Sequence, residues 1–259
     1  MINAFALISL VSFIICLTLG IIVYLKKVKY VFDNSLGKMF VLLCLSLALC
    51  WASIEFGYRS TDEFSIAYFW LKINVAWYIV ISFLMHFTLI FTENSKLLRN
   101  KLTYVIIYGP ALIFILIDTT TNLLVTEPVK ETWGWTYGIP KYPLVHTISS
   151  TWAAFAAVFC LYMCLEYYLS QHNTIKKKRA EYVMLGLLIP VGISFNTEWL
   201  FPVAGIKSPE LFVPATTIYL IIIGYSIWAY GKTDKKKQYA EIKIKVDDLT
   251  QKELHNSYF

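Results

Sequence analysis

The ionisable side chains within the long apolar stretches of this sequence are the residues that could do chemistry. Charged groups are costly inside a bilayer, so they usually mark a binding site or an internal ion pair. Lys72 is the lysine that falls within an apolar stretch, and several carboxylates share its predicted depth. We expect a ligand site formed by these groups and by loop tryptophans: Glu55, Lys72, Asp118, Trp133, Trp135, His146, Asn196 and Glu198.

The spacing of these residues indicates an ion-pair network around an outward-facing cavity. Trp51, Glu55 and Arg59 are spaced i, i+4 and i+8, so they share one face of a helix. One lysine with several carboxylates at similar depth would line such a cavity. Trp133 and Trp135 lie in a loop rich in aromatic residues and would cover it as a lid.

A plainer interpretation stands beside this one. Groups one or two turns from a helix end can reach headgroups or water, which fits Asp118 and His146. Glu198 is the deepest carboxylate, which favours a pocket or an interhelical pair. The aromatic residues of 122–143 fit an interfacial belt as well as a lid.

Motifs that would mark an enzyme are missing from the sequence. There is no glycine-rich phosphate loop, no His-Glu-x-x-His metal spacing and no Gly-x-Ser-x-Gly elbow. The cysteines fall within apolar stretches without a Cys-x-x-Cys pair, and we interpret them as small apolar helix residues. The last apolar stretch has no lysine, which excludes a retinal Schiff base there. We therefore expect no catalysis, no metal and no cofactor.

The composition requires a lipid environment around the elements that position these residues. Hydrophobic residues make up 58% of the chain and charged residues 15%, and the mean hydropathy is +0.58. Soluble domains are about 45–50% apolar and about 25% charged. The net charge of +6 does not indicate a nucleic-acid partner, because the basic residues cluster between the apolar stretches.

Seven apolar stretches are long enough to cross a bilayer as helices, which need about 20 residues. Lipid offers no partner for the backbone, so stretches of this length must be helical, and strands of a barrel would be shorter and alternating. The sequence predicts an all-α membrane protein, a seven-transmembrane helix bundle. The stretches are Ala4–Leu25, Met39–Phe56, Ala67–Phe91, Leu102–Thr121, Leu144–Leu169, Tyr182–Phe201 and Leu211–Tyr230.

The basic residues predict the orientation of this bundle. Eighteen of the 23 Lys and Arg residues fall on one side of the stretches and four on the other, with Lys72 within a stretch. Because the basic side faces the cytoplasm, the N-terminus is predicted outside and the C-terminus inside. No basic region precedes the first stretch, so we expect an uncleaved helix rather than a signal peptide.

Two regions are expected along the chain. Residues 1–233 form the seven-helix domain, and residues 234–259 form a short basic cytoplasmic tail. The tail is below the size at which an unaided domain becomes stable, so we expect it to be solvated. The alternation in 241–247 leaves open a short strand or a partner-bound segment.

Several stretches of the chain resemble a known family. They are the Ala48–Trp51 motif followed by Glu55, LKINVAWYIVISFLMHFTLIFTEN, GPALIFILIDTTTNLL, LGLLIPVGISFNTEWLFPVAGI and the exit YSIWAYGKTD. In their order and loop lengths they resemble the N-terminal seven-transmembrane sensory region of membrane histidine kinases, over about Met39 to Asp234. The resemblance implies a sensory receptor that transmits a signal through its last helix, with a homodimer as the signalling unit.

The sequence departs from that family at two places. Ser82 lies near a position where many members carry a proline, and no kinase module follows the last helix. His255 has none of the context of a phosphoacceptor histidine. We therefore expect a stand-alone receptor, a truncated chain, or a membrane subunit that works through another chain, without kinase activity of its own.

The functional hypothesis is a multi-pass cell-membrane receptor module that detects an extracellular or membrane-borne signal. Its expected partners are the lipid bilayer, a small-molecule or peptide signal, a second copy of the chain, and a separate cytoplasmic signalling protein or membrane complex, with no nucleic acid. The alternatives are a small-solute transporter and a non-catalytic membrane subunit of a larger complex. A transporter needs polar groups along the cytoplasmic half, and His86 and Glu166 are the main ones there.

Overall fold

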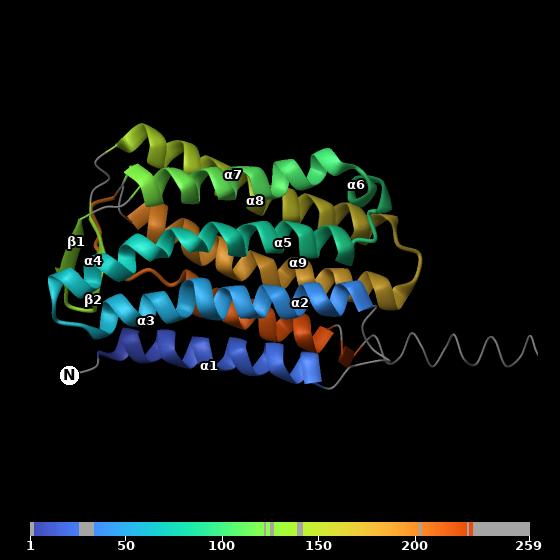
Figure 1. Cartoon of the computed structure of the whole chain (residues 1–259). Helices are drawn as coiled ribbons and strands as arrows, with labels where there is room; N and C mark the ends of the chain where they lie inside the picture. Colours follow the sequence, from blue (N-terminus) through green and yellow to red (C-terminus); the bar gives the residue numbers. More distant parts are fainter. Residues whose placement is uncertain are drawn as a thin grey trace, which may run out of the picture.

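The computed structural model is a bundle of long helices with a small β-hairpin at one end (Figure 1). It describes residues 3–25, 34–121, 123–124, 127–138, 142–201, 204–226 and 228–229. The elements are α1 (Ala4–Leu25), α2 (Asn34–Leu47), η1 (Ala48–Ala52), α3 (Ser53–Ser60), α4 (Phe64–Ile73), η2 (Asn74–Ala76), α5 (Trp77–Phe91), α6 (Ser95–Arg99), α7 (Lys101–Thr121), β1 (Pro128–Glu131), β2 (Gly134–Tyr137), α8 (Pro143–Ser170), α9 (Thr174–Ser194) and η3 (Phe195–Leu200).

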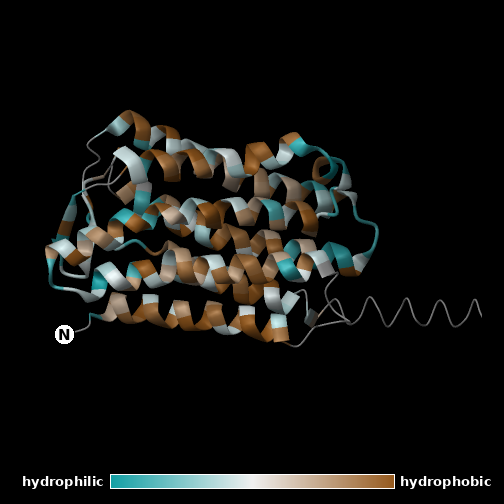
Figure 2. Cartoon of the chain, in the orientation of Figure 1, coloured by the Kyte–Doolittle hydropathy of each residue, from teal (hydrophilic) through white to brown (hydrophobic). Residues whose placement is uncertain are grey.

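Six helices of the described chain are long and apolar enough to cross a membrane. They carry large apolar side chains on their outer surfaces, such as Val11 on α1, Leu112 on α7 and Val158 on α8. Figure 2 shows apolar residues along the helices and hydrophilic residues in the connections at the two ends. The spans are Ala4–Leu25, Ser35–Ser60, Phe64–Phe91, Lys101–Thr121, Pro143–Ser170 and Thr174–Glu198.

The seventh predicted stretch contains a shorter apolar helix, Phe212–Ser226. We call it the terminal helix. Its residues Tyr219, Leu220 and Ile223 are fully buried in the main core, so it belongs to the interior of the bundle. The all-helical membrane bundle is confirmed with six candidate spans, whereas seven crossings and the N-outside orientation stay predictions.

The two ends of the bundle differ, and we name them for what they carry. The hairpin end holds β1, β2 and the start of α1 (Figure 1). The α6 end holds α6 and the start of α9. Between them, α5 packs against α2, α7 and α8, so it lies at the centre of the bundle.

Local sequence signals define where several elements begin. The Asn3 side chain accepts a hydrogen bond from the backbone of Ala6 (2.7 Å) and so caps α1. Asn173 caps α9 in the same way, and α8 begins with Pro143, which suits a first helical position. Gly134 has a φ of 111°, which a glycine adopts readily, and it starts β2 after the hairpin turn.

The structure corrects two expectations about this end of the molecule. The loop 122–143 contains an antiparallel hairpin, in which Val129 pairs with Thr136 and Lys130 with Trp135. The second and third spans also begin earlier than predicted, at 35 and 64, and the second continues to Ser60. It continues because Arg59 finds charged partners inside the bundle. The predicted boundary at 233 and the tail 234–259 lie outside the described residues.

Candidate functional site

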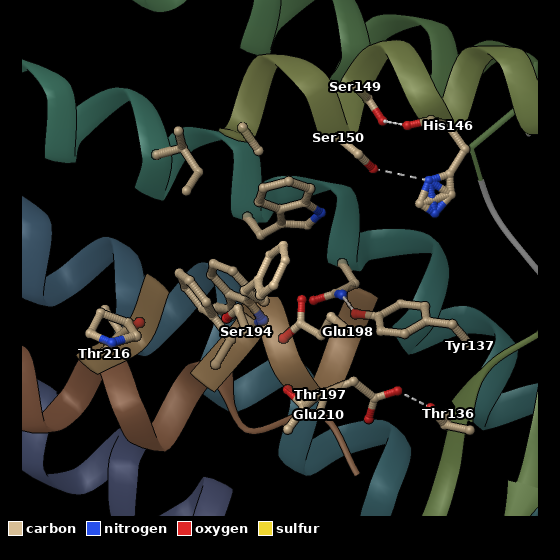
Figure 3. Close-up of a pocket in the computed structure, with 18 of the residues that line it drawn as sticks. Thr136, Tyr137, His146, Ser149, Ser150, Ser194, Thr197, Glu198, Glu210 and Thr216 are labelled. Carbon is tan, nitrogen blue, oxygen red and sulfur yellow. Dashed lines mark hydrogen bonds between the residues drawn. The ribbon is translucent and has the colours of Figure 1, made fainter. Parts of the chain in front are cut away.

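A pocket of about 990 Å³ lies between the hairpin and the interior of the bundle. Its walls come from α5, α8, α9, η3, the hairpin and the terminal helix (Figure 3). Ligand pockets in proteins usually measure about 300–1,000 Å³. This volume therefore suits an organic molecule of substantial size.

Three departures from α-helical geometry lie around this pocket. The π-helical turn η1 contributes Trp51, the 3₁₀ turn η2 contributes Asn74, and the π-helical turn η3 contributes Glu198. Turns of this kind re-aim side chains and frequently occur at functional sites. Here each one places a residue on the wall of the same pocket.

A buried ion-pair network lies beside the pocket at the hairpin end. The Arg59 guanidinium contacts Glu55 (Nη1–Oε1, 3.0 Å) and Glu210 (Nη2–Oε2, 2.7 Å). Glu55 and Arg59 are each only 2% exposed. Ser9 of α1 donates a second hydrogen bond to Glu55 (3.0 Å). Buried charges persist only when they are paired and hydrogen-bonded, and this network meets both conditions.

Glu210 connects this network to the hairpin and to the pocket. Its carboxylate accepts hydrogen bonds from Arg59 and from the hydroxyl of Thr136 on β2 (Figure 3). Its backbone carbonyl accepts a further bond from Arg59 Nη2 (3.0 Å). Glu210 also lines the pocket and lies two residues before the terminal helix. Glu210 thus connects the pocket wall and Arg59 to the segment that precedes the terminal helix.

The hairpin is held against the helices by polar contacts. Trp135 Nε1 donates to the carbonyl of Thr61 (3.0 Å). The Tyr137 hydroxyl accepts a bond from the side chain of Asn74. Burial raises the pKa of Tyr137 well above its ordinary value, and the charge of Glu210 raises it further. Tyr137 therefore stays a neutral phenol.

The lining divides into a polar part and an apolar part. Near the hairpin it includes Glu198 and Glu210, with Lys207 paired to Glu131 (2.6 Å). Deeper in the bundle the walls are mostly apolar or small, with these residues: Ile81, Leu84, Ala153, Ala154, Ala157 and Leu187. The terminal helix adds the hydroxyl groups of Thr216 and Tyr219. The pocket is therefore amphipathic along its length.

Four of the eight residues predicted for the site lie on the lining of this pocket. They are Asp118, Trp133, His146 and Glu198. Asp118 is 1% exposed and accepts a bond from the backbone of Leu124 (2.8 Å). Figure 3 shows His146 with Ser149 and Ser150 on one wall and Glu198 across from them. That these residues bind a ligand stays a prediction.

The other four predicted residues lie outside the lining. Glu55 belongs to the ion-pair network behind the wall, and Trp135 holds the hairpin against α4. The structure separates Lys72 from the carboxylates: in the described chain it forms no ion pair. Asn196 is exposed and its side chain donates to the carbonyl of Gly192 (2.7 Å), within its own helix.

The cation of the network is Arg59, which pairs with the buried carboxylates. The spacing of four residues between Glu55 and Arg59 had indicated that the two share a helix face. The expectation that Lys72 would pair with the carboxylates is wrong for the described chain. Glu210 gave no such signal, because it lies in a polar connection where acidic residues are common. In the part of the chain that the structure describes, no group of three acidic, His or Cys residues could hold a metal ion.

Comparison with known proteins places this chain in a family. Residues 8–234 match the family model described as the N-terminal 7TM region of histidine kinase. The match covers most of the chain, so the chain belongs to this family. No curated protein matches it. The chain is accordingly a multi-pass protein of the cell membrane, in a family that forms the sensory rather than the catalytic region of two-component kinases.

Proposed function

We propose that this member of the histidine-kinase 7TM family is a ligand-responsive sensory module without catalytic activity. A signal molecule occupies the pocket at the hairpin end, and the terminal helix carries the response to the α6 end. The N-terminus and the hairpin end lie outside the cell, and the terminal helix completes a seventh crossing. The observation that carries this proposal is the position of Glu210, which joins the pocket, Arg59 and the terminal helix.

The contacts of the terminal helix support transmission. Thr217 lies 3.5 Å from Cys16 of α1, so the two side chains are within hydrogen-bonding distance. An added Cβ at Gly186 of α9 would lie 3.1 Å from Tyr219, which shows how closely α9 approaches the terminal helix. A tightly packed helix moves as a unit rather than deforming locally. Displacement of Glu210 therefore shifts the balance between two packing arrangements of this helix, and a ligand needs only to favour one of them.

A sensory module of this kind passes its response to a partner. We propose that the chain acts as a homodimer, or through a separate cytoplasmic signalling protein or membrane complex. The dense cluster of basic residues in 176–179 at the α6 end supports placing that end in the cytoplasm. The family membership supports a signalling partner over a transport role.

A chimeric receptor tests this proposal without knowledge of the ligand. Residues 1–234 are fused to the kinase module of a family member, and autophosphorylation is measured in membranes. Glu210→Gln weakens the tie between Arg59 and the terminal helix, so the basal kinase output should change severalfold. The matched control is Asp62→Asn, which removes a carboxylate from an exposed ion pair outside the pocket lining without touching Arg59. Equal output from the wild-type chimera and Glu210→Gln, both at normal abundance, would refute the proposed route.

A transport function makes the opposite prediction. The described lining reaches Leu84 and Leu187 and is mostly apolar there, with the neutral hydroxyl of Tyr219 but no charged group, which disfavours a path for a charged solute to the α6 end. Purified chain in proteoliposomes should therefore show no saturable flux of a labelled amine or amino acid above that of empty vesicles. Saturable flux abolished by Glu198→Gln would favour the transporter.

A further inference from the structure

The pocket has chemical features that specify a class of ligand. We propose that it binds a cationic amphiphile: a molecule with an N–H-bearing cation, such as a primary ammonium, at one end and an apolar body at the other. This inference rests on the proposed function only in taking the pocket as the signal site. It concerns what occupies that site.

The charges around the polar part favour a cation. Four carboxylates line the pocket among the described residues, against one lysine: Asp118, Glu131, Glu198 and Glu210, with Lys207. Lys207 is paired to Glu131, and Glu210 is paired to Arg59. Glu198 has no ion-pair partner in the described chain. Arg59 is itself shared between two carboxylates, so carboxyl groups outnumber cations in the polar part and a bound cation would pair with Glu198.

An unsatisfied acceptor lies in the same wall. Asn74 is 2% exposed, and its Oδ1 is buried without a hydrogen-bond partner, while its Nδ2 donates to Tyr137. A buried acceptor without a partner costs free energy that a donor from a ligand would recover. The headgroup that fits both Asn74 and Glu198 is therefore positively charged and carries N–H donors.

Aromatic rings form the wall next to this polar part. Trp51 stacks on Phe212 with ring centroids 4.2 Å apart and contacts Trp77 at 5.4 Å. The ring centroids of Trp77 and Tyr78 are 4.0 Å apart. All four rings line the pocket. Aromatic faces attract ammonium groups and disfavour carboxylates and phosphates. The rings thus add to the selectivity that the carboxylates provide.

The deeper part of the pocket fits an apolar chain. Asn74 and Leu84 lie on consecutive helical segments, so the lining extends roughly 15 Å along the bundle at 1.5 Å per residue. On α8 the opposite wall is built from small side chains, Ala153, Ala154 and Ala157. These alanines leave the width that an alkyl chain or a small ring system needs. An inorganic cation or a short polar peptide would leave this part empty.

Three probes of equal length and different headgroup test the proposal. Octylamine, octanol and octanoate are titrated into the full chain in zwitterionic nanodiscs by isothermal titration calorimetry, with empty nanodiscs as the blank. Octylamine should bind saturably and at least tenfold more tightly than octanol, because a hydrogen bond to a charged group is stronger than one between neutral groups. Octanoate should bind most weakly. No preference for octylamine in the wild-type chain would overturn the assignment, and this arm requires no variant to fold.

Matched variants locate the binding. Glu198→Gln should reduce the affinity for octylamine roughly tenfold and leave octanol unchanged. Glu63→Gln, which removes an exposed carboxylate outside the lining at the hairpin end, should change neither. Ala157→Leu should weaken all three probes by filling the apolar part, whereas Val158→Leu on the outer face of α8 should not. A preference for octylamine that survives Glu198→Gln would overturn the proposal.

The experiments distinguish a failure of the signalling route through Glu210 from a failure of the proposed ligand class. Octylamine that binds at Glu198, with no change in the chimera on Glu210→Gln, supports the ligand class and refutes the signalling route. A changed output in the chimera, with no preference among the probes, supports signalling and refutes the cationic amphiphile.

Discussion

The two ends of the bundle handle their charges differently. At the hairpin end, Glu55 and Arg59 are buried in an ion-pair network that reaches three segments of the chain. At the α6 end, Lys176 pairs with Glu93 (2.8 Å), with side chains 28% and 56% exposed. The nearby contact of Lys177 with the ring of Tyr168 also lies at the surface (4.7 Å). The Glu55–Arg59 pair is built into the packing, whereas Lys176 and Lys177 at the α6 end keep partial contact with solvent.

This difference indicates which end is specialised. Exposed basic residues at a helix end need little support and serve as anchors at the membrane surface. A buried network must be fully partnered to be tolerated, so it constrains where its helices lie. In the described structure the large pocket adjoins the buried network, and the core around Phe87, Cys160 and Cys164 toward the α6 end is apolar. We infer that the hairpin end responds to signals and the α6 end maintains the position in the membrane.

Arg59→Gln is the change with the largest expected effect on stability. It leaves Glu55 and Glu210 buried without their cation, which should lower the free energy of unfolding by about 3–5 kcal/mol. Thermal unfolding in nanodiscs measures it. Lys130→Gln is the control, because Lys130 belongs to an exposed ion pair with Asp62.

A second change tests whether the stability loss of Arg59→Gln comes from the unpaired carboxylates or from altered packing. Adding Glu55→Gln to Arg59→Gln removes one of the stranded carboxylates, so the double variant should recover part of the lost stability. If the losses in free energy of unfolding of the two single variants simply add in the double variant, the network acts through packing alone. The described ion pairs would then not distinguish the two ends.

A close helix contact at the hairpin end gives the next largest effect. A Cβ on Gly57 would lie 2.4 Å from Cδ2 of Trp70, so Gly57→Ala forces α3 and α4 apart. Overpacking of this kind costs about 1–3 kcal/mol. Gly109→Ala is the matched control, because its nearest neighbour would lie at an ordinary 3.8 Å. Equal unfolding temperatures for the two variants would show that α3 can shift freely.

The link between the hairpin and Glu210 should make a smaller contribution. Thr136→Val keeps the shape of the side chain and removes the hydroxyl that donates to the Glu210 carboxylate. A loss of about 1 kcal/mol is expected from one hydrogen bond. Protease cleavage of the hairpin should accelerate more than global unfolding does. Unchanged cleavage would mean that the contacts of Trp135 and Tyr137 hold the hairpin instead.

The α6 end supplies the complementary test. Lys176→Gln removes the partner of Glu93, and an exposed pair contributes less than about 1 kcal/mol. The unfolding temperature should therefore stay within a degree or two of the wild type. A loss comparable to that of Arg59→Gln would remove the contrast between the ends.

The sequence allowed the helices to be predicted well and the site only in part. Long apolar stretches must be helical in lipid, so the first six were found from hydropathy alone. The hairpin was missed because β1 and β2 are only four residues each, and such a loop offers no periodic pattern long enough to read. Its strands depend on contacts with distant residues, such as that between Trp135 and Thr61.

The site residues show the same limit. Glu198 and Asp118 stood out because a carboxylate in an apolar helix is rare. Lys72 and Arg59 lie on different helices at similar depth. Deciding which of them pairs with the buried carboxylates also required knowing how each helix is rotated about its own axis. Arg59 faces the bundle and Lys72 does not reach a carboxylate in the described structure. Hydropathy gives depth along a helix, and it does not give the direction that each side chain takes.

The smallest predicted effect tests whether the exposed pairs at the hairpin end behave like those at the α6 end. A hydrogen bond and the charge from Lys130 hold the pKa of Asp62 below its ordinary value of 3.8. The pair therefore contributes fully above pH 3.8, and its contribution disappears as the pH falls through the lowered pKa. Lys130→Gln should raise the pKa of Asp62 toward its ordinary value, measured by carboxyl NMR, and the accompanying loss of stability at neutral pH should be too small to detect by thermal unfolding. A measurable loss there would mean that this exposed pair also holds the hairpin in place, and that the specialised region extends to the surface.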